Sequence, residues 1–148
     1  IMKKQIILGC LFSILSGGLI YVLFRQDSLK MFSWFESVNL SNSISEMRLF
    51  TLPLSIYLPD WFLYSLPDGL WLFSYVSFLL FVWGNVISKH NIHWVILVPL
   101  IAIFSELGQL IKVIPGTFDV VDLCSYFLGA VLPILIFANL KTNKPITT

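Results

Sequence analysis

Four long apolar runs constrain this chain more than any other feature of its sequence. A helix needs about 20 mostly apolar residues to cross the hydrocarbon core of a bilayer, and runs of this kind cover residues 6–24, 67–87, 93–113 and 118–139. Hydrophobic residues make up 57% of the chain and charged residues only 11%, whereas soluble domains carry about 25% charged residues. We therefore expect an all-α integral membrane protein, with a four-transmembrane-helix bundle as a single domain over residues 1–148.

The basic residues predict how the spans are oriented. With the N-terminus inside, the charged residues of the cytoplasmic side are all lysines: Lys3, Lys4, Lys89, Lys141 and Lys144. The outer side then carries Arg25, Lys30, Arg48 and Lys112 together with the acidic residues of the first loop. Because short cytoplasmic loops are enriched in Lys and Arg, we expect both termini inside, in a multi-pass protein of the bacterial inner (cytoplasmic) membrane. The first run lacks a small-x-small cleavage site and is expected to be a retained anchor.

The first loop, residues 26–66, is expected to contain an amphipathic segment along the outer membrane surface. Its aromatic residues are mixed with Asp and Ser, a composition typical of headgroup depth. The tripeptide Leu-Pro-Asp occurs at residues 58–60 and again at 66–68. Proline suits the first turn of a helix and aspartate suits its positive end, so each copy predicts a helix start, with a ligand-binding repeat as the alternative. The second span, rich in Phe, Leu, Tyr and Trp, is expected to face lipid and the interface.

Small residues recur every fourth position in the first span, at Gly9, Ser13 and Gly17. This small-xxx-small pattern lets two helix backbones approach closely. We predict a packing seam here, made either with another helix of the same chain or with another subunit. A homo-oligomer or a separate membrane-protein partner is therefore expected beside the lipid bilayer.

The last two spans hold most of the intramembrane polarity. Helical spacing places Ala102, Ser105, Glu106, Gln109 and Lys112 on one stripe, and Asp119, Asp122, Ser125, Tyr126 and Gly129 on another. An antiparallel hairpin turning at Pro115-Gly116 would pair Lys112 with Asp119, Gln109 with Asp122, Glu106 with Ser125, Ser105 with Tyr126 and Ala102 with Gly129. The candidate site is this polar hairpin of Glu106, Gln109, Lys112, Asp119, Asp122 and Tyr126, with Glu106 and Asp122 as candidate catalytic groups.

Each of these polar residues also has a structural interpretation. Asp119 fits the N-cap of the fourth helix, and Asp122 fits the N3 position that reaches back to the cap. Lys112 fits a side chain that snorkels to the headgroups. Glu106 and Gln109 fit interhelical hydrogen bonds. An intramembrane carboxylate is costly, by about 2.5–3.5 kcal/mol on insertion scales, so Glu106 is expected to be protonated, hydrogen-bonded or open to water.

The remaining motifs point away from common catalytic and cofactor chemistry. The sequence has no Ser–His–Asp set, no glycine-rich phosphate loop and no cysteine motif. His90 and His93 lack a third ligand for a metal. The net charge of +1 provides no basic field for nucleic acid. We expect no cofactor, no metal and no nucleic-acid partner.

At the hairpin the chain resembles the VanZ-like family of small membrane proteins. That family's signature, Glu-x-x-Gln, an Arg-x-Phe-Asp/Glu turn, then Asp, Asn and Gly, is matched by Glu106, Gln109, Phe118, Asp119, Asp122 and Gly129. Gly116 and Tyr126 stand where the family has its arginine and asparagine. An earlier Asp-Lys-x-x-His motif retains only Asp68, with Gly69 and Leu72 at the Lys and His positions. Members are associated with glycopeptide resistance, so the resemblance implies a role in the cell envelope and supports the hairpin as the site.

Three functions remain open on these observations. The leading hypothesis is a non-catalytic subunit or accessory factor of a cell-envelope system, because no catalytic set is recognisable. The second is an envelope enzyme or lipid-handling protein that uses an outward-facing site at Glu106 and Asp122. The third is an ion- or proton-coupled pathway in an oligomer, with Glu106 as the titrating group.

Overall fold

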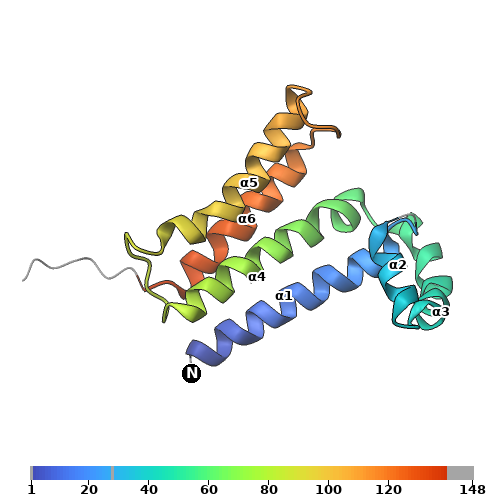
Figure 1. The fold of residues 1–148 in the computed structure, drawn as a ribbon, viewed down its shortest axis with the longest axis horizontal. Helices are drawn as coiled ribbons and strands as arrows, with labels where there is room; N and C mark the ends of the chain where they lie inside the picture. The colour runs from blue at the N-terminus through green and yellow to red at the C-terminus, as the bar shows by residue number, and fades with distance from the viewer. Residues whose placement is uncertain (1, 28, 140–148) are drawn as a thin grey trace, which may run out of the picture.

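The computed structural model describes residues 2–27 and 29–139, and this part of the chain is all-α (Figure 1). Four segments are long and apolar enough to cross a membrane: Lys3–Phe24, Trp61–Val82, Ile92–Leu110 and Val120–Phe137. They correspond to the helices α1 (Met2–Phe24), α4 (Leu66–Val82), α5 (Ile92–Leu110) and α6 (Val120–Phe137), with the π-helical segment η2 (Trp61–Ser65) running directly into α4. The protein is thus a multi-pass membrane protein, and the prediction of an all-α, four-span fold is confirmed.

The central helix of the bundle is α4, which packs against α1 on one side and α6 on the other (Figure 1). The neighbour of α5 is chiefly α6. The expectation that the second span mainly faces lipid and the interface is wrong, because α4 is the most buried of the four spans. Small residues explain its place: Ser74 and Ser77 are buried, and the Ser74 hydroxyl donates to the Cys10 carbonyl of α1 at 3.0 Å.

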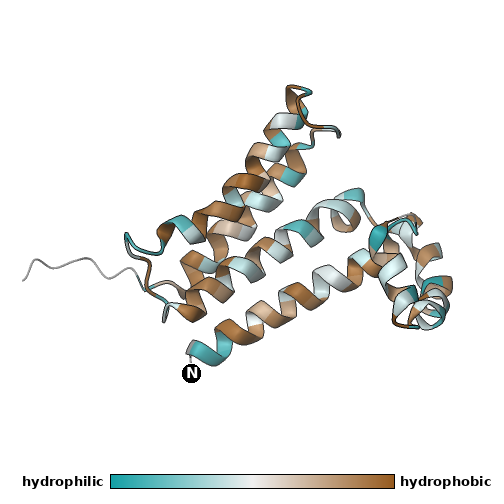
Figure 2. Cartoon of the chain, in the orientation of Figure 1, coloured by the Kyte–Doolittle hydropathy of each residue, from teal (hydrophilic) through white to brown (hydrophobic). Residues whose placement is uncertain are grey.

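The apolar core lies near the end of the bundle where α4 finishes and α5 begins. It consists of Ile6, Val76, Leu80, Val95 and Phe137, which come from all four spans. Figure 2 shows hydrophobic colours along the long helices and hydrophilic colours gathered towards their ends and connections. Large apolar side chains also cover the outside of the bundle, as Phe12 and Leu135 do at 72% exposure each. In a bilayer these outer faces contact lipid.

Two spans end earlier than predicted, each at residues with left-handed backbone. The second was expected to reach residue 87, but α4 ends at Val82, and Gly84 and Asn85 follow with φ of 60° and 68°. Asn85 therefore lies in a buried turn after the helix, where its carbonyl accepts a hydrogen bond from the Asn139 N–H at 2.7 Å. The third was expected to reach residue 113, but α5 ends at Leu110, before Lys112 with φ of 58°.

The long first loop folds into short helices at the C-terminal end of α1 (Figure 1). These are α2 (Lys30–Ser37), α3 (Ser41–Thr51) and the 3-10 segment η1 (Leu52–Tyr57). Large apolar side chains such as Trp34 (68%) and Phe50 (79%) remain exposed on them. The first Leu-Pro-Asp copy ends directly before η2, so this predicted helix start is confirmed. The second copy lies where η2 passes without a break into α4, so it marks a change from π-helix to α-helix within one span and not a new helix start. The location of this loop at the outer surface stays a prediction, and Lys141 and Lys144, used to orient the chain, lie outside the described residues.

Candidate functional site

Glu106 is the most deeply buried carboxylate of the predicted hairpin, with only 2% of its surface exposed. Its Oε1 atom accepts a hydrogen bond from the Asp119 backbone N–H at 2.6 Å. Its Oε2 atom accepts one from Gln109 Nε2 at 3.3 Å. Both oxygens are therefore occupied, and Glu106 holds the α5–α6 connection against the end of α5.

The start of α6 follows one of the two capping predictions. Asp119 is the N-cap, and its Oδ1 atom accepts from the Val121 N–H at 2.8 Å. The interpretation of Asp122 as the residue that reaches back to this cap is wrong. The Asp119 N–H, which a capping box would give to Asp122, is given to Glu106 instead. Glu106, which lies on the neighbouring helix α5, thus takes the role that the N3 side chain has in a capping box.

The level-by-level pairing predicted for α5 and α6 is also wrong. Lys112 is exposed in the turn, and the described residues contain no ion pair between it and Asp119. The polar face of α6 is turned to α4: the Tyr126 hydroxyl donates to Asp68 Oδ2 at 3.4 Å. A Cβ atom on Gly129 would clash with the Gly69 carbonyl oxygen of α4. Glycine on both helices allows a closer backbone approach than Ala102 of α5 would allow, so α6 presents its small and polar face to α4.

The contact between α4 and α6 creates an acidic cluster, which we define as Asp68, Asp122 and Tyr126. Asp122 Oδ1 is buried and has no hydrogen-bond partner among the described residues. Asp122, Glu106 and Arg25 are all close enough for their charges to act on the Asp68 carboxylate. In the described part of the chain, no three His, Cys, Asp or Glu side chains are placed to hold a metal ion. The chemistry that the cluster offers is acceptance of hydrogen bonds from a donor ligand.

Arg25 supplies a positive charge at this end of the bundle. Its guanidinium carbon lies 5.1 Å from the centre of the Tyr21 ring and 4.7 Å from that of Tyr64, within the range of a cation–π contact. Its Nε atom is buried without a partner in the described residues. The sequence indicated Arg25 only as the charged end of the first span, and Asp68 only as part of the second Leu-Pro-Asp tripeptide and through the family resemblance.

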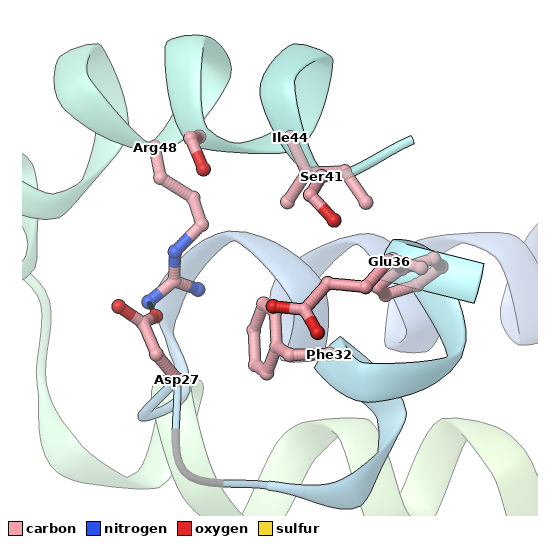
Figure 3. Close-up of a pocket in the computed structure, with 8 residues that line it drawn as sticks. Asp27, Phe32, Glu36, Ser41, Ile44 and Arg48 are labelled. Carbon is pink, nitrogen blue, oxygen red and sulfur yellow. Dashed lines mark hydrogen bonds and ion pairs between the residues drawn. The ribbon is translucent and has the colours of Figure 1, made fainter. Parts of the chain in front are cut away.

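Arg48, which the sequence indicated only as a basic residue of the outer side, binds the C-terminal end of α1 (Figure 3). Its side chain is nearly buried, and Nη1 donates to the Val22 carbonyl at 2.5 Å while Nη2 donates to the Arg25 carbonyl at 2.7 Å. The same Nη2 pairs with Asp27. The last carbonyls of a helix lack partners and favour a cation, so Arg48 attaches α3 to α1. Its signal was a lone basic residue among the polar and apolar residues of α3.

The predicted packing seam is used inside the chain. Ser13 is buried at 4% exposure. A Cβ atom on Gly17 would lie 2.8 Å from Trp71 Nε1 and 3.0 Å from the Pro67 carbonyl oxygen, both of α4. A Cβ atom on Gly9 would lie 3.4 Å from the Phe137 ring of α6. Of the two alternatives left open for the seam, the structure shows contact within one chain.

The residues that carry the family resemblance gather at two neighbouring places, the α5–α6 turn and the contact between α4 and α6. Gly116, at the arginine position of the signature, has φ of 144°, and a Cβ there would clash with the Gln109 side chain. The turn is therefore built for glycine. Comparisons with family models, curated proteins and solved structures find no match to the chain. The resemblance stays a prediction, and the candidate site rests on its own geometry.

Proposed function

We propose that this protein is a lipid-handling protein of the cell envelope that binds an amine-bearing headgroup at the acidic cluster. The observation that supports it is the buried Asp122 Oδ1 atom, which has no donor among the described residues. An unsatisfied buried polar group costs about 1–3 kcal/mol, and more when it is charged. A ligand that supplies a donor to this oxygen recovers that cost.

The charges around the cluster favour a cationic ligand. The charges of Asp122 and Glu106 both act on the Asp68 carboxyl group, and Arg25 is the cation that acts on the same group. A primary ammonium has three donors, and its hydrogen bonds to carboxylates are among the stronger ones in proteins. The Tyr126 hydroxyl adds a neutral partner beside Asp68.

An apolar groove between the same two helices offers room for part of an acyl chain. It has a volume of about 170 Å³, and its lining includes Leu66, Leu70, Phe73, Leu128 and Leu132. Gly69 and Ser125 also line it and adjoin Asp68 and Tyr126 in the chain. The groove and the cluster together match a molecule with a polar amine and an apolar tail.

Asp122→Asn tests this function directly, because it removes the charge and keeps the shape. Binding of phosphatidylethanolamine from vesicles to the purified protein is measured by native mass spectrometry. We expect about tenfold weaker retention, equivalent to about 1.4 kcal/mol, with an unchanged melting temperature. Tyr126→Phe should weaken retention by a smaller factor because Asp68 keeps its charge.

Asp119→Asn is the matched control, since it changes an acid at the same helix end and Asn is an equally good N-cap. It should bind phosphatidylethanolamine as the wild type does. Equal retention by wild type, Asp122→Asn and Asp119→Asn would reject the cluster as the headgroup site.

A second candidate function is a non-catalytic subunit or accessory factor. It is favoured by how many polar groups are used to hold the fold, since both oxygens of Glu106 and both Nη atoms of Arg48 are occupied within the chain. Another membrane protein should then co-purify with this chain in a mild detergent, at a fixed stoichiometry. A strictly monomeric preparation with no accompanying protein would count against it.

A further inference from the structure

A second apolar groove lies beside the C-terminal part of α1, between α1, α2 and α4. Its volume is about 470 Å³, and its lining includes Gly18, Tyr21, Val22, Met31, Trp34 and Trp71. A Cβ atom on Gly18 would meet nothing within 4 Å. The seam on the neighbouring face of α1 is filled by α4, whereas the space beside Gly18 is left open.

The rim of this groove carries an unpaired positive charge. Lys30, at the start of α2, lines the groove and is exposed. No acidic side chain of the described residues forms an ion pair with it. The acid nearest to it along the described chain, Asp27, is already paired with Arg48.

The aromatic residues around Lys30 indicate where the groove lies in a membrane. Tyr21 is near the end of α1, and its ring centre is 5.1 Å from that of Trp71. Trp34 is 68% exposed on α2. Trp and Tyr are enriched at headgroup depth, and a lysine beside them extends its ammonium towards the phosphates. The groove therefore opens where acyl chains meet headgroups.

We infer that this groove holds a phospholipid, with its phosphate on Lys30 and an acyl chain along Gly18 and Trp71. The apolar lining matches hydrocarbon, and the unpaired ammonium matches the phosphate in charge. This lipid is bound through its phosphate and lies between α1 and α4. It is independent of the amine-binding function proposed for the contact between α4 and α6.

Gly18→Phe tests the acyl-chain part of the site, because the new ring enters open space and fills the groove. The full-length protein is purified, incubated with vesicles of phosphatidylglycerol and analysed by native mass spectrometry. Wild type should retain one phosphatidylglycerol per chain, and Gly18→Phe should reduce this occupancy at least tenfold. Lys30→Glu should reduce it several-fold, with the wild-type affinity falling as salt is added.

Leu19→Phe is the control, since Leu19 neighbours Gly18 on α1, is 53% exposed and is outside the groove. It should retain phosphatidylglycerol as the wild type does. Equal retention by the wild type and Gly18→Phe overturns the inference. A second test places a photo-reactive group at Met31, which lines the groove. Cross-linking of this group to another protein or to a second copy of this chain, in place of lipid, also overturns the inference.

The two lipid sites can be distinguished by measuring the retention of both lipids by both variants. Asp122→Asn should lose phosphatidylethanolamine at the acidic cluster and keep the retained phosphatidylglycerol. Gly18→Phe should lose the phosphatidylglycerol and keep the phosphatidylethanolamine that is bound at the acidic cluster. If Gly18→Phe alone fails to change retention, only the groove inference is rejected, and the proposed function keeps its own test.

Discussion

Glu106 shows how the cost of burying one carboxylate shapes the structure around it. The side chain is 2% exposed, and it takes the Asp119 N–H and the Gln109 amide as donors. A buried acid is tolerated when hydrogen bonds satisfy its oxygens. The expectation that Glu106 would be hydrogen-bonded is confirmed, but its main donor is a backbone N–H that no side-chain pattern displays. No observation in the described residues favours Glu106 as a group free to carry protons through the membrane.

Replacing Glu106 should therefore destabilise the α5–α6 turn. Glu106→Leu removes both acceptors and leaves the Asp119 N–H unpaired, which we expect to cost about 1–3 kcal/mol. Glu106→Gln keeps one oxygen and should cost less. Thermal unfolding in detergent micelles measures both. The control is Glu46→Leu at an exposed position of α3; equal melting temperatures for Glu46→Leu and Glu106→Leu would contradict the structural role.

At the scale of elements, glycines decide how closely α4 and α6 approach. Gly129 of α6 faces the Gly69 carbonyl, and a Cβ on Gly69 would lie 2.9 Å from the Ser125 carbonyl oxygen. Backbones in such close contact leave no space for a methyl group. The same approach brings Tyr126 to Asp68, so the acidic cluster depends on the packing of these two helices.

Gly129→Ala should force α4 and α6 apart, because overpacking of a tight contact costs about 1–3 kcal/mol. Gly18→Ala is the matched substitution at a glycine with open space, and it should leave the stability unchanged or slightly higher. The melting temperatures of both variants in detergent provide the comparison. A Gly129→Ala protein as stable as Gly18→Ala would show that the helices do not meet closely at this point.

At the scale of the whole molecule, we expect the four spans to return the described chain to the side on which it began. α2 and α3 are then on the side opposite to the connection between α4 and α5. The distribution of basic residues predicts that this connection, with Lys89, is cytoplasmic.

Labelling with a membrane-impermeant maleimide tests this orientation in intact cells. Cys10 and Cys124 are first replaced by alanine, and a single cysteine is introduced by Ser43→Cys in α3 or by Lys89→Cys, both at exposed positions. Ser43→Cys should be labelled in intact cells, and Lys89→Cys only after permeabilisation. The reverse pattern would invert the predicted topology.

The number and approximate place of the spans were predictable because hydropathy is a local property. Each run of about 20 apolar residues satisfies the bilayer without reference to the rest of the chain. The N-cap at Asp119 was predictable for a similar reason, since its partner, Val121, is only two residues away. The ends of α4 and α5 were predicted less well, because left-handed residues such as Asn85 and Lys112 interrupt the helices without a proline.

By itself, then, the sequence determined an all-α protein with four spans and a polar C-terminal hairpin. Only the tertiary structure decided that α4 is central, that Arg48 closes α1 and that Tyr126 meets Asp68 across 58 positions of sequence. The physical reason is that helical spacing defines a face of each helix but not the helix that this face contacts. That choice depends on which backbones can approach most closely, and here Gly69 and Gly129 gave α6 a closer neighbour in α4 than in α5.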